Sequence, residues 1–116
     1  MARYERLLTG DVDRFVTHLD NTIQDSSVTA KPEDGSDHRL GDARMVVRVY
    51  ERYSASGGNR VSLSISILSV GEDMAVSAIT SGGSRAMFFK MNTLGEETFL
   101  ERAVEAIEIW VRATNR

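Results

Sequence analysis

The chain has 116 residues, which is the usual size of one domain, and this predicts a single domain over residues 1–116. There is no cysteine, which excludes disulfides, thiol catalysis and cysteine-ligated zinc. The formal net charge of −3 disfavours a nucleic-acid-binding module, because such modules usually present a basic face. No apolar run approaches the ~20 residues of a bilayer-spanning helix, and no secretory signal is visible. We therefore expect a cytoplasmic protein with no nucleic-acid or membrane partner.

The first two elements are predicted to be a strand and a helix. Residues 3–8 are partly apolar and are followed by Gly10. Asp11 can cap a helix, because its carboxylate accepts hydrogen bonds from the free amide groups of the first turn. Apolar residues then recur at helical spacing and form one narrow stripe, made of Val12, Phe15, Val16, Leu19 and Ile23. This pattern predicts a helix over residues 11–25.

Residues 26–42 are the least regular stretch of the chain. A short strand is predicted at residues 27–31. Pro32 cannot donate to a strand ladder, and residues 33–37 are typical of a turn and loop. The acidic residues and the histidine of this stretch are Glu33, Asp34, Asp37, His38 and Asp42. Their spacing does not match a calcium loop, so we expect a solvated loop and no metal site.

Residues 43–91 are predicted to form a four-stranded antiparallel meander. Apolar and polar residues alternate from Met45 to Tyr50, and most clearly from Val61 to Ile67, which is the period of a strand. A third strand starts at Met74, and a fourth is predicted over residues 85–91. Turns that contain glycine separate these strands, at residues 56–59, 71–73 and 81–84.

A long helix is predicted at the end of the chain, over residues 94–113. Thr93 and Glu96 have the spacing of a capping box, and a broad apolar face follows them. The predicted order is therefore β-α-β-β-β-β-β-α, an α+β fold in which an antiparallel meander carries two helices on one face. This order resembles the TATA-binding-protein-like and helix-grip type of fold, a likeness of topology that implies no function.

Two longer stretches resemble a small uncharacterised bacterial family, a domain of unknown function. They are GDARMVVRVYERYSASGGNRVSLS, residues 41–64, and SAITSGGSRAMFFKMNTLGEETFL, residues 77–100. The resemblance covers nearly the full length of the chain. It implies a bacterial protein of one domain, and it carries over no activity, cofactor, partner or functional residue.

A Ser-Gly-Gly turn followed by an arginine occurs twice in the predicted meander. The first and third hairpins of a meander lie at the same end of the sheet, so these two turns should be neighbours. Glycine turns can form anion-binding nests, and arginine suits phosphate or carboxylate groups. Two interpretations stay open: ordinary hairpin turns with solvated arginines, or a site for a small anionic ligand. The residues of that site would be Gly57, Gly58, Arg60, Gly82, Gly83 and Arg85.

A second candidate site is the polar face of the predicted sheet. If Val47 and Val49 face the helices, together with the apolar residues of the strand at 61–67, the polar residues between them face the other way. These residues are Arg44, Arg48, Tyr50, Arg52, Ser62, Ser64 and Ser66. Such a face can be solvated, can form a homodimer interface, or can bind a ligand. Leu68 is the exception, because it lies in phase with the serines.

No set of residues has the nucleophile, base and orienting group of an enzyme site, so we expect no catalytic residue and no cofactor. His18 lies off the apolar stripe and is expected to be partly exposed, whereas Trp110 is expected in the core. The preferred function is a non-enzymatic binding or interaction domain that acts on a protein or a small anionic ligand, or forms a homodimer. The alternative is a small-ligand-binding domain with a cavity between the C-terminal helix and the sheet.

Overall fold

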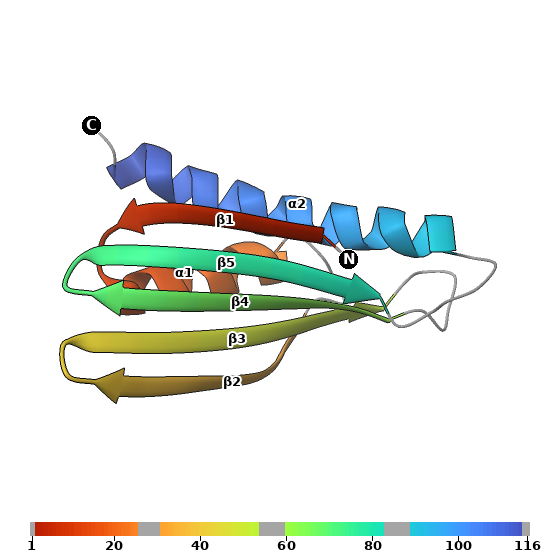
Figure 1. The fold of residues 1–116 in the computed structure, drawn as a ribbon. Coiled ribbons are helices and arrows are strands. Elements are labelled where there is room, and N and C mark those ends of the chain that lie inside the picture. The colour runs from red at the N-terminus through yellow and green to blue at the C-terminus, as the bar shows by residue number, and fades with distance from the viewer. Residues whose placement is uncertain (1, 26–30, 54–59, 83–88, 115–116) are drawn as a thin grey trace.

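A computed structural model describes residues 2–25, 31–53, 60–82 and 89–114, with the backbone alone for residues 53 and 89–98. The described residues form five strands and two helices, in the order β1-α1-β2-β3-β4-β5-α2 (Figure 1). The elements are β1 (Ala2–Thr9), α1 (Val12–Asp25), β2 (Lys31–Leu40), β3 (Ala43–Tyr53), β4 (Arg60–Val70), β5 (Asp73–Gly82) and α2 (Phe89–Thr114). The predicted α+β class and antiparallel sheet are confirmed.

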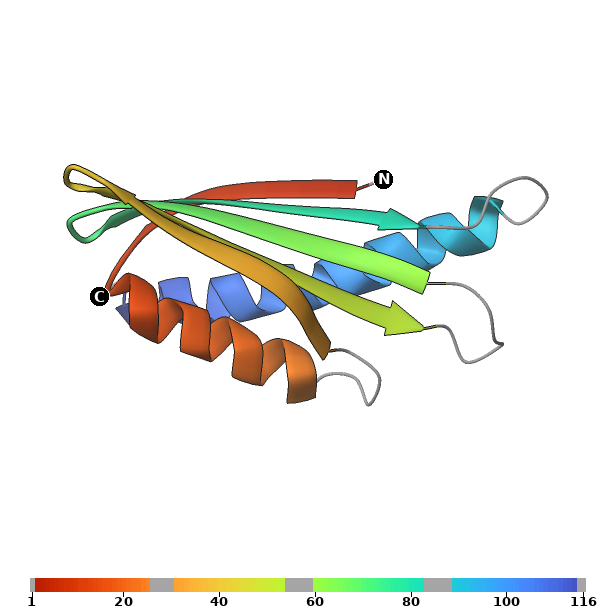
Figure 2. The same cartoon turned by 90° about the horizontal axis from the view of Figure 1, so that it is seen from below.

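All neighbouring strands of the sheet are antiparallel, in the order β1-β5-β4-β3-β2. Strands β2 to β5 form a meander, and β1 returns to pair with the free side of β5. Both helices lie against one face of the sheet, which we call the inner face (Figure 2). No described helix or strand covers the opposite face, which we call the outer face.

Helix α1 begins as the sequence predicts. The carboxylate of Asp11 accepts a hydrogen bond from the backbone amide of Arg14 at 3.0 Å, which makes Asp11 the N-cap. The apolar stripe faces the sheet, and its buried members are Val12, Phe15, Leu19 and Ile23. Burial of this stripe, more than helix propensity, stabilises a helix of 14 residues.

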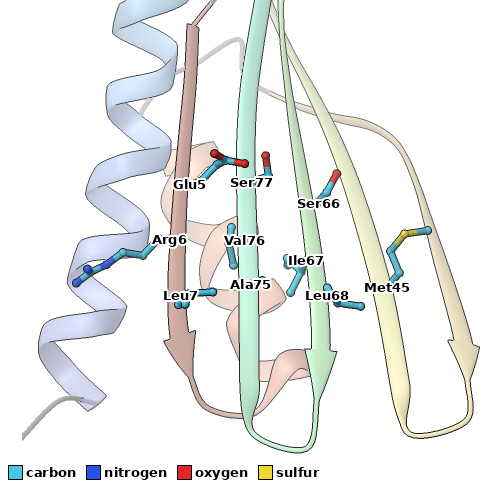
Figure 3. Close-up of a pocket in the computed structure, with 10 residues that line it drawn as sticks. All are labelled: Glu5, Arg6, Leu7, Met45, Ser66, Ile67, Leu68, Ala75, Val76 and Ser77. Atoms are coloured by element: carbon cyan, nitrogen blue, oxygen red, sulfur yellow. The ribbon is translucent and has the colours of Figure 1, made fainter.

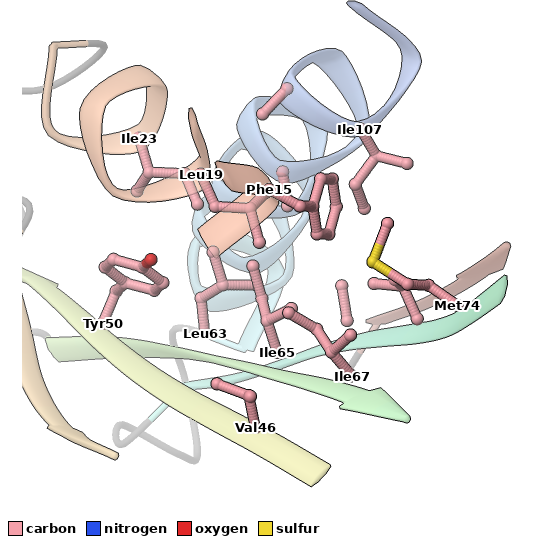
Figure 4. Packing of buried hydrophobic residues seen from close by; sticks show 14 of the residues in the cluster. Phe15, Leu19, Ile23, Val46, Tyr50, Leu63, Ile65, Ile67, Met74 and Ile107 are labelled. Atoms are coloured by element: carbon pink, nitrogen blue, oxygen red, sulfur yellow. The ribbon is translucent and has the colours of Figure 1, made fainter. Parts of the chain in front are cut away.

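The hydrophobic core lies between the helices and the inner face (Figure 4). Strand β4 contributes every second residue, and Leu63, Ile65 and Ile67 expose none of their surface. Phe15 of α1 and Ile107 of α2 pack onto them and are equally buried. The alternation in β4 thus has the predicted period and the predicted phase.

The turn between β1 and α1 is tied to the end of α2. The indole Nε1 of Trp110 donates a hydrogen bond to the carbonyl of Thr9 at 2.9 Å. Gly10 has a φ of 135°, and a Cβ added there would lie 2.6 Å from Cζ2 of Trp110. Glycine is therefore required at this position for its backbone angle and for the close approach of the indole ring.

The predicted strand at residues 85–91 and the capping box are not supported. Residues 89–91 already belong to α2, and residues 83–88 lie outside the described part of the chain. Thr93 and Glu96 lie within α2, so Thr93 is not its N-cap. The apolar residues between 86 and 91 have no clean period, and short runs of this kind do not distinguish a strand from a helix.

The predicted loop at residues 33–37 is also wrong, because it belongs to β2. The predicted strand at 27–31 overlaps β2 only at Lys31, since residues 26–30 lie outside the described part. Every residue of β2 is exposed, and its pairing with β3 shifts register between Pro32 and Asp34. A polar edge strand has no apolar alternation to reveal it. Strand β2 is instead defined by its hydrogen-bonded pairing with β3 and by the turn between the two strands, where Gly41 has a φ of 61°.

Candidate functional site

Strand β3 turns its arginines towards the helices, which is the opposite of the predicted orientation. Arg48 pairs with Ile65 and Tyr50 pairs with Leu63, and both of these β4 residues are fully buried on the inner face. Tyr50 itself exposes no surface. The inner-face set therefore includes Arg44, Arg48, Tyr50 and Arg52, and the predicted placement of these residues on the polar face is wrong.

The acidic residues of α1 explain this orientation. The carboxylate of Asp20 accepts hydrogen bonds from the Arg48 guanidinium, with Nε at 3.2 Å, and from the Tyr50 hydroxyl. A partly buried arginine such as Arg48 needs a partner for its charge, and Asp20 provides one across the helix–sheet interface. Burial, and then the hydrogen bond to Asp20, raise the pKa of the Tyr50 hydroxyl.

Arg44 joins three elements on the same face. Its NH2 group lies 2.8 Å from the carboxylate of Asp13 in α1 and 2.6 Å from that of Asp37 in β2. The hydrogen bond from Arg44 lowers the pKa of both carboxyls below their usual range. Arg52 lies over the ring of Phe99 in α2, 4.8 Å from its centroid. These arginines hold helices and edge strand to the sheet.

The centre of the outer face carries no ionisable side chain. The serines of β4 lie there as expected, but their neighbours on β3 are valines: Ser66 pairs with Val47 and Ser64 with Val49. Across β3, β4 and β5 the outer face is built from apolar and small polar residues. This central set is Met45, Val47, Val49, Ser64, Ser66, Leu68, Ala75, Ser77 and Ile79.

A row of apolar side chains crosses the outer face at one level (Figure 3). Leu7 pairs with Ala75, Ala75 with Leu68, and Leu68 with Met45, so the row spans four neighbouring strands. The exposed fractions are 79% for Leu7, 52% for Leu68 and 42% for Met45. A shallow hollow of about 490 Å³ lies over Ala75 and the adjacent Ser66, between the side chains of Leu7 and Leu68, and Glu5 of the rim lines its edge. Leu68 is the one member of this row that the sequence pattern singled out.

Charged residues surround this centre. Arg3 and Glu5 lie on the outer face of β1, with 4.0 Å between their charged groups. Glu51 and Arg60 pair at 3.2 Å at the far ends of β3 and β4. The outer face of β2 adds further polar and charged side chains, those of Lys31, Asp34, Ser36 and His38. The outer face therefore has an uncharged centre and a rim with charges of both signs.

The predicted anion site lies mostly outside the described residues. Gly57, Gly58, Gly83 and Arg85 are not described. Gly82 pairs with Val61, next to Arg60, so the ends of β4 and β5 meet as the meander predicted. Arg60 forms an ion pair with the carboxylate of Glu51. Anion binding at this end of the sheet stays a prediction.

His18 has a structural position at the contact between the two helices. It is half-buried, and its Nε2 donates a hydrogen bond to the carbonyl of Ala106 in α2 at 2.6 Å. Because a carbonyl only accepts, this contact places a proton on Nε2. Within the described ranges, no group of three or more metal-ligating side chains comes together. Neither α1 nor α2, the helices of the described part, has the length and apolar character needed to cross a bilayer.

Comparison with curated proteins and with solved structures gives no match. Comparison with protein families gives one, which extends from residue 1 to residue 111 and therefore includes every strand of the sheet, α1 and most of α2. The resemblance stated from the sequence is confirmed by this match. The chain belongs to the family of unknown function DUF6054.

Proposed function

We propose that this protein is a non-enzymatic interaction domain that binds a flat protein surface through the outer face of its sheet. The observation that carries the proposal is the exposed apolar row through Leu7, Leu68 and Met45 in an uncharged centre. Contiguous apolar surface of this kind on a small protein marks an interaction site or a binding groove.

The distribution of charge supports a protein partner. Interfaces between proteins are depleted of charge at their core and polar at their rim, which is the arrangement on this face. The hollow over Ala75 is open and shallow, so it suits side chains projecting from another surface better than an enclosed small molecule. The bacterial and cytoplasmic setting expected from the sequence stays a prediction.

The alternative, a ligand cavity between α2 and the sheet, has less support. Phe15, Ile65 and Ile107 lie in that space, and their exposed fraction is zero. No water-sized void therefore borders these side chains. Phe99, which faces the sheet from α2, is buried to the same extent. The burial of these four side chains supports an interaction domain over a ligand cavity at this place.

Site-specific photo-crosslinking in cells that naturally make the chain tests the proposal. A photoreactive residue replaces Leu68 on the outer face, and in the control it replaces Ile109, which is 41% exposed on α2. We expect a covalent adduct with another polypeptide from position 68 and none from position 109. The adduct should disappear when Ala75→Arg adds a charge beside Leu68. No adduct at 68, or equal adducts at both positions, would contradict the proposal.

A further inference from the structure

We infer that the occupant of the outer face is a second copy of this chain, bound face to face about a two-fold axis. The inference rests on the proposed function, because it names the partner for the same surface. The assembly would have four layers, with two sheets in contact at the centre and the helices on the outside. Sheets of this kind pack about 10 Å apart.

The shape of the outer face is self-complementary. In a two-fold interface the same surface is used by both copies, so each projection must meet a depression of its own kind. Leu7 and Leu68 project from the face, and the hollow of about 490 Å³ lies between them over Ala75. A leucine of each copy can therefore enter the hollow of the other. Two copies also share one strand twist, which is the condition for aligned packing of sheets.

The size of the face meets the requirement of a stable dimer. Five strands spaced ~4.8 Å apart, with every neighbouring pair matched over eight residues or more at ~3.3 Å per residue, give a projected face of roughly 650 Å² or more. Side chains make the accessible area larger than this projection. A standard interface buries about 800 Å² on each partner. The outer face thus has the area that a two-fold dimer needs, with no other element required.

The edges of the sheet are poor surfaces for a second copy, which favours the face. Strand β2 carries Pro32 and several charges along its free edge, and these features oppose strand addition. Helix α2 runs alongside β1, where Glu108 accepts a hydrogen bond from Tyr4 and pairs with Arg6 at 3.2 Å (Figures 1 and 3). The rim of the face has charges of both signs, so a second copy meets no uniform repulsion.

Sedimentation velocity of the purified full chain, over concentrations from below micromolar to hundreds of micromolar, tests the inference. We expect a reversible dimer for the natural sequence. Leu68→Arg places a charge in the centre of the interface and should weaken dimerisation at least a hundred-fold. Ile109→Arg is the matched control, because it adds the same charge to an exposed position on α2 and should leave the dimer unchanged. Circular dichroism checks that each variant is folded.

The outcomes separate this inference from the proposed function. If the natural sequence stays monomeric over the whole concentration range, the inference that a second copy binds the outer face is overturned. In that case an adduct between position 68 and a different polypeptide still supports the proposed interaction domain. A dimer that survives Leu68→Arg also overturns the inference, because the contact must lie elsewhere. If Leu68→Arg fails to fold, Leu68→Ser, which matches the neighbouring serines, replaces it and should weaken the dimer about ten-fold. An unchanged dimer in that variant contradicts the inference equally.

Discussion

The inner and outer faces of strand β3 differ in their residues and in the groups that contact them. On the inner face, Arg48 and Tyr50 donate to Asp20 of α1, so polar groups lie where a core is usually apolar. On the outer face, Met45 and Val47 lie where a single-layered sheet is usually polar. The strand has polar residues inside because the helix supplies their partner. The apolar residues outside have no described partner, which is the basis of the proposed interface.

Strand β4, directly beside β3, has the opposite pattern. From Val61 to Ile67 its inner residues are apolar and the outer residues between them are serines. The two strands therefore differ in which residues face the helices. Strand β3 faces the acidic residues of α1, whereas β4 faces the apolar residues of α1 and α2. Substitutions on the inner and outer faces show how much each face contributes to the free energy of unfolding.

The largest difference is expected between Ile65→Ala and Leu68→Ala, two positions on β4 that face opposite sides. Ile65 is fully buried, so its truncation should lower the free energy of unfolding by ~2–5 kcal/mol. Leu68 is 52% exposed, and at concentrations where the chain is monomeric its truncation should cost less than ~1 kcal/mol. Urea denaturation measures both values. Equal losses would contradict the distinction between a packed inner face and an open outer face.

A smaller effect is expected for Asp20→Ala, which tests the polar part of the inner face. The variant leaves Arg48 and Tyr50 without their common acceptor, and it should lower the free energy of unfolding by about 2 kcal/mol. Asp25→Ala, at an exposed position on the same helix, is the control and should have little effect. Urea denaturation of both variants gives the comparison. A loss no larger than that of the control would mean that Asp20 does not hold β3 in its orientation.

The smallest effect is expected from pH and concerns the edge of the inner face. The hydrogen bond with Arg44 lowers the pKa of Asp37 in the folded chain, whereas an aspartate in the unfolded chain has a pKa of about 4. The ion pair therefore stabilises the fold above about pH 4, and this contribution is lost as the pH falls through the lower, folded-state pKa. The free energy of unfolding should decrease between about pH 5 and about pH 3, and it should decrease less in Asp37→Asn. The same decrease in both proteins would exclude Asp37 as a source of acid sensitivity.

The elements that the sequence predicted well are those with a local signal. The cap at Asp11 and the alternation in β4 are readable from neighbouring residues alone. Strand β2 and the first turns of α2 have no such signal, because the edge strand is almost entirely polar and the start of the helix mixes apolar and polar residues without a helical period. The conformation of β2 depends instead on its pairing with β3.

The candidate site was predicted only in part, for a related reason. Alternation gave the period of β3 but not its phase, since both Val47 and Arg48 could face the core until Asp20 is known to lie opposite. The apolar row also needs the strand order, because Leu7 and Leu68 become neighbours only through β5. Leu68 was the one visible sign, as an apolar residue in phase with serines.

The return of β1 to the free side of β5 has a consequence for how the chain folds. Between β1 and its partner β5 the chain contains α1 and the strands β2 to β4, and Trp110, which donates a hydrogen bond to the carbonyl of Thr9, lies later still. A ribosome therefore releases β1 long before it makes the residues that hold it. Each hairpin of the meander joins strands that are neighbours in the chain, whereas the pairing of β1 with β5 closes a long loop, and closing a long loop slows folding.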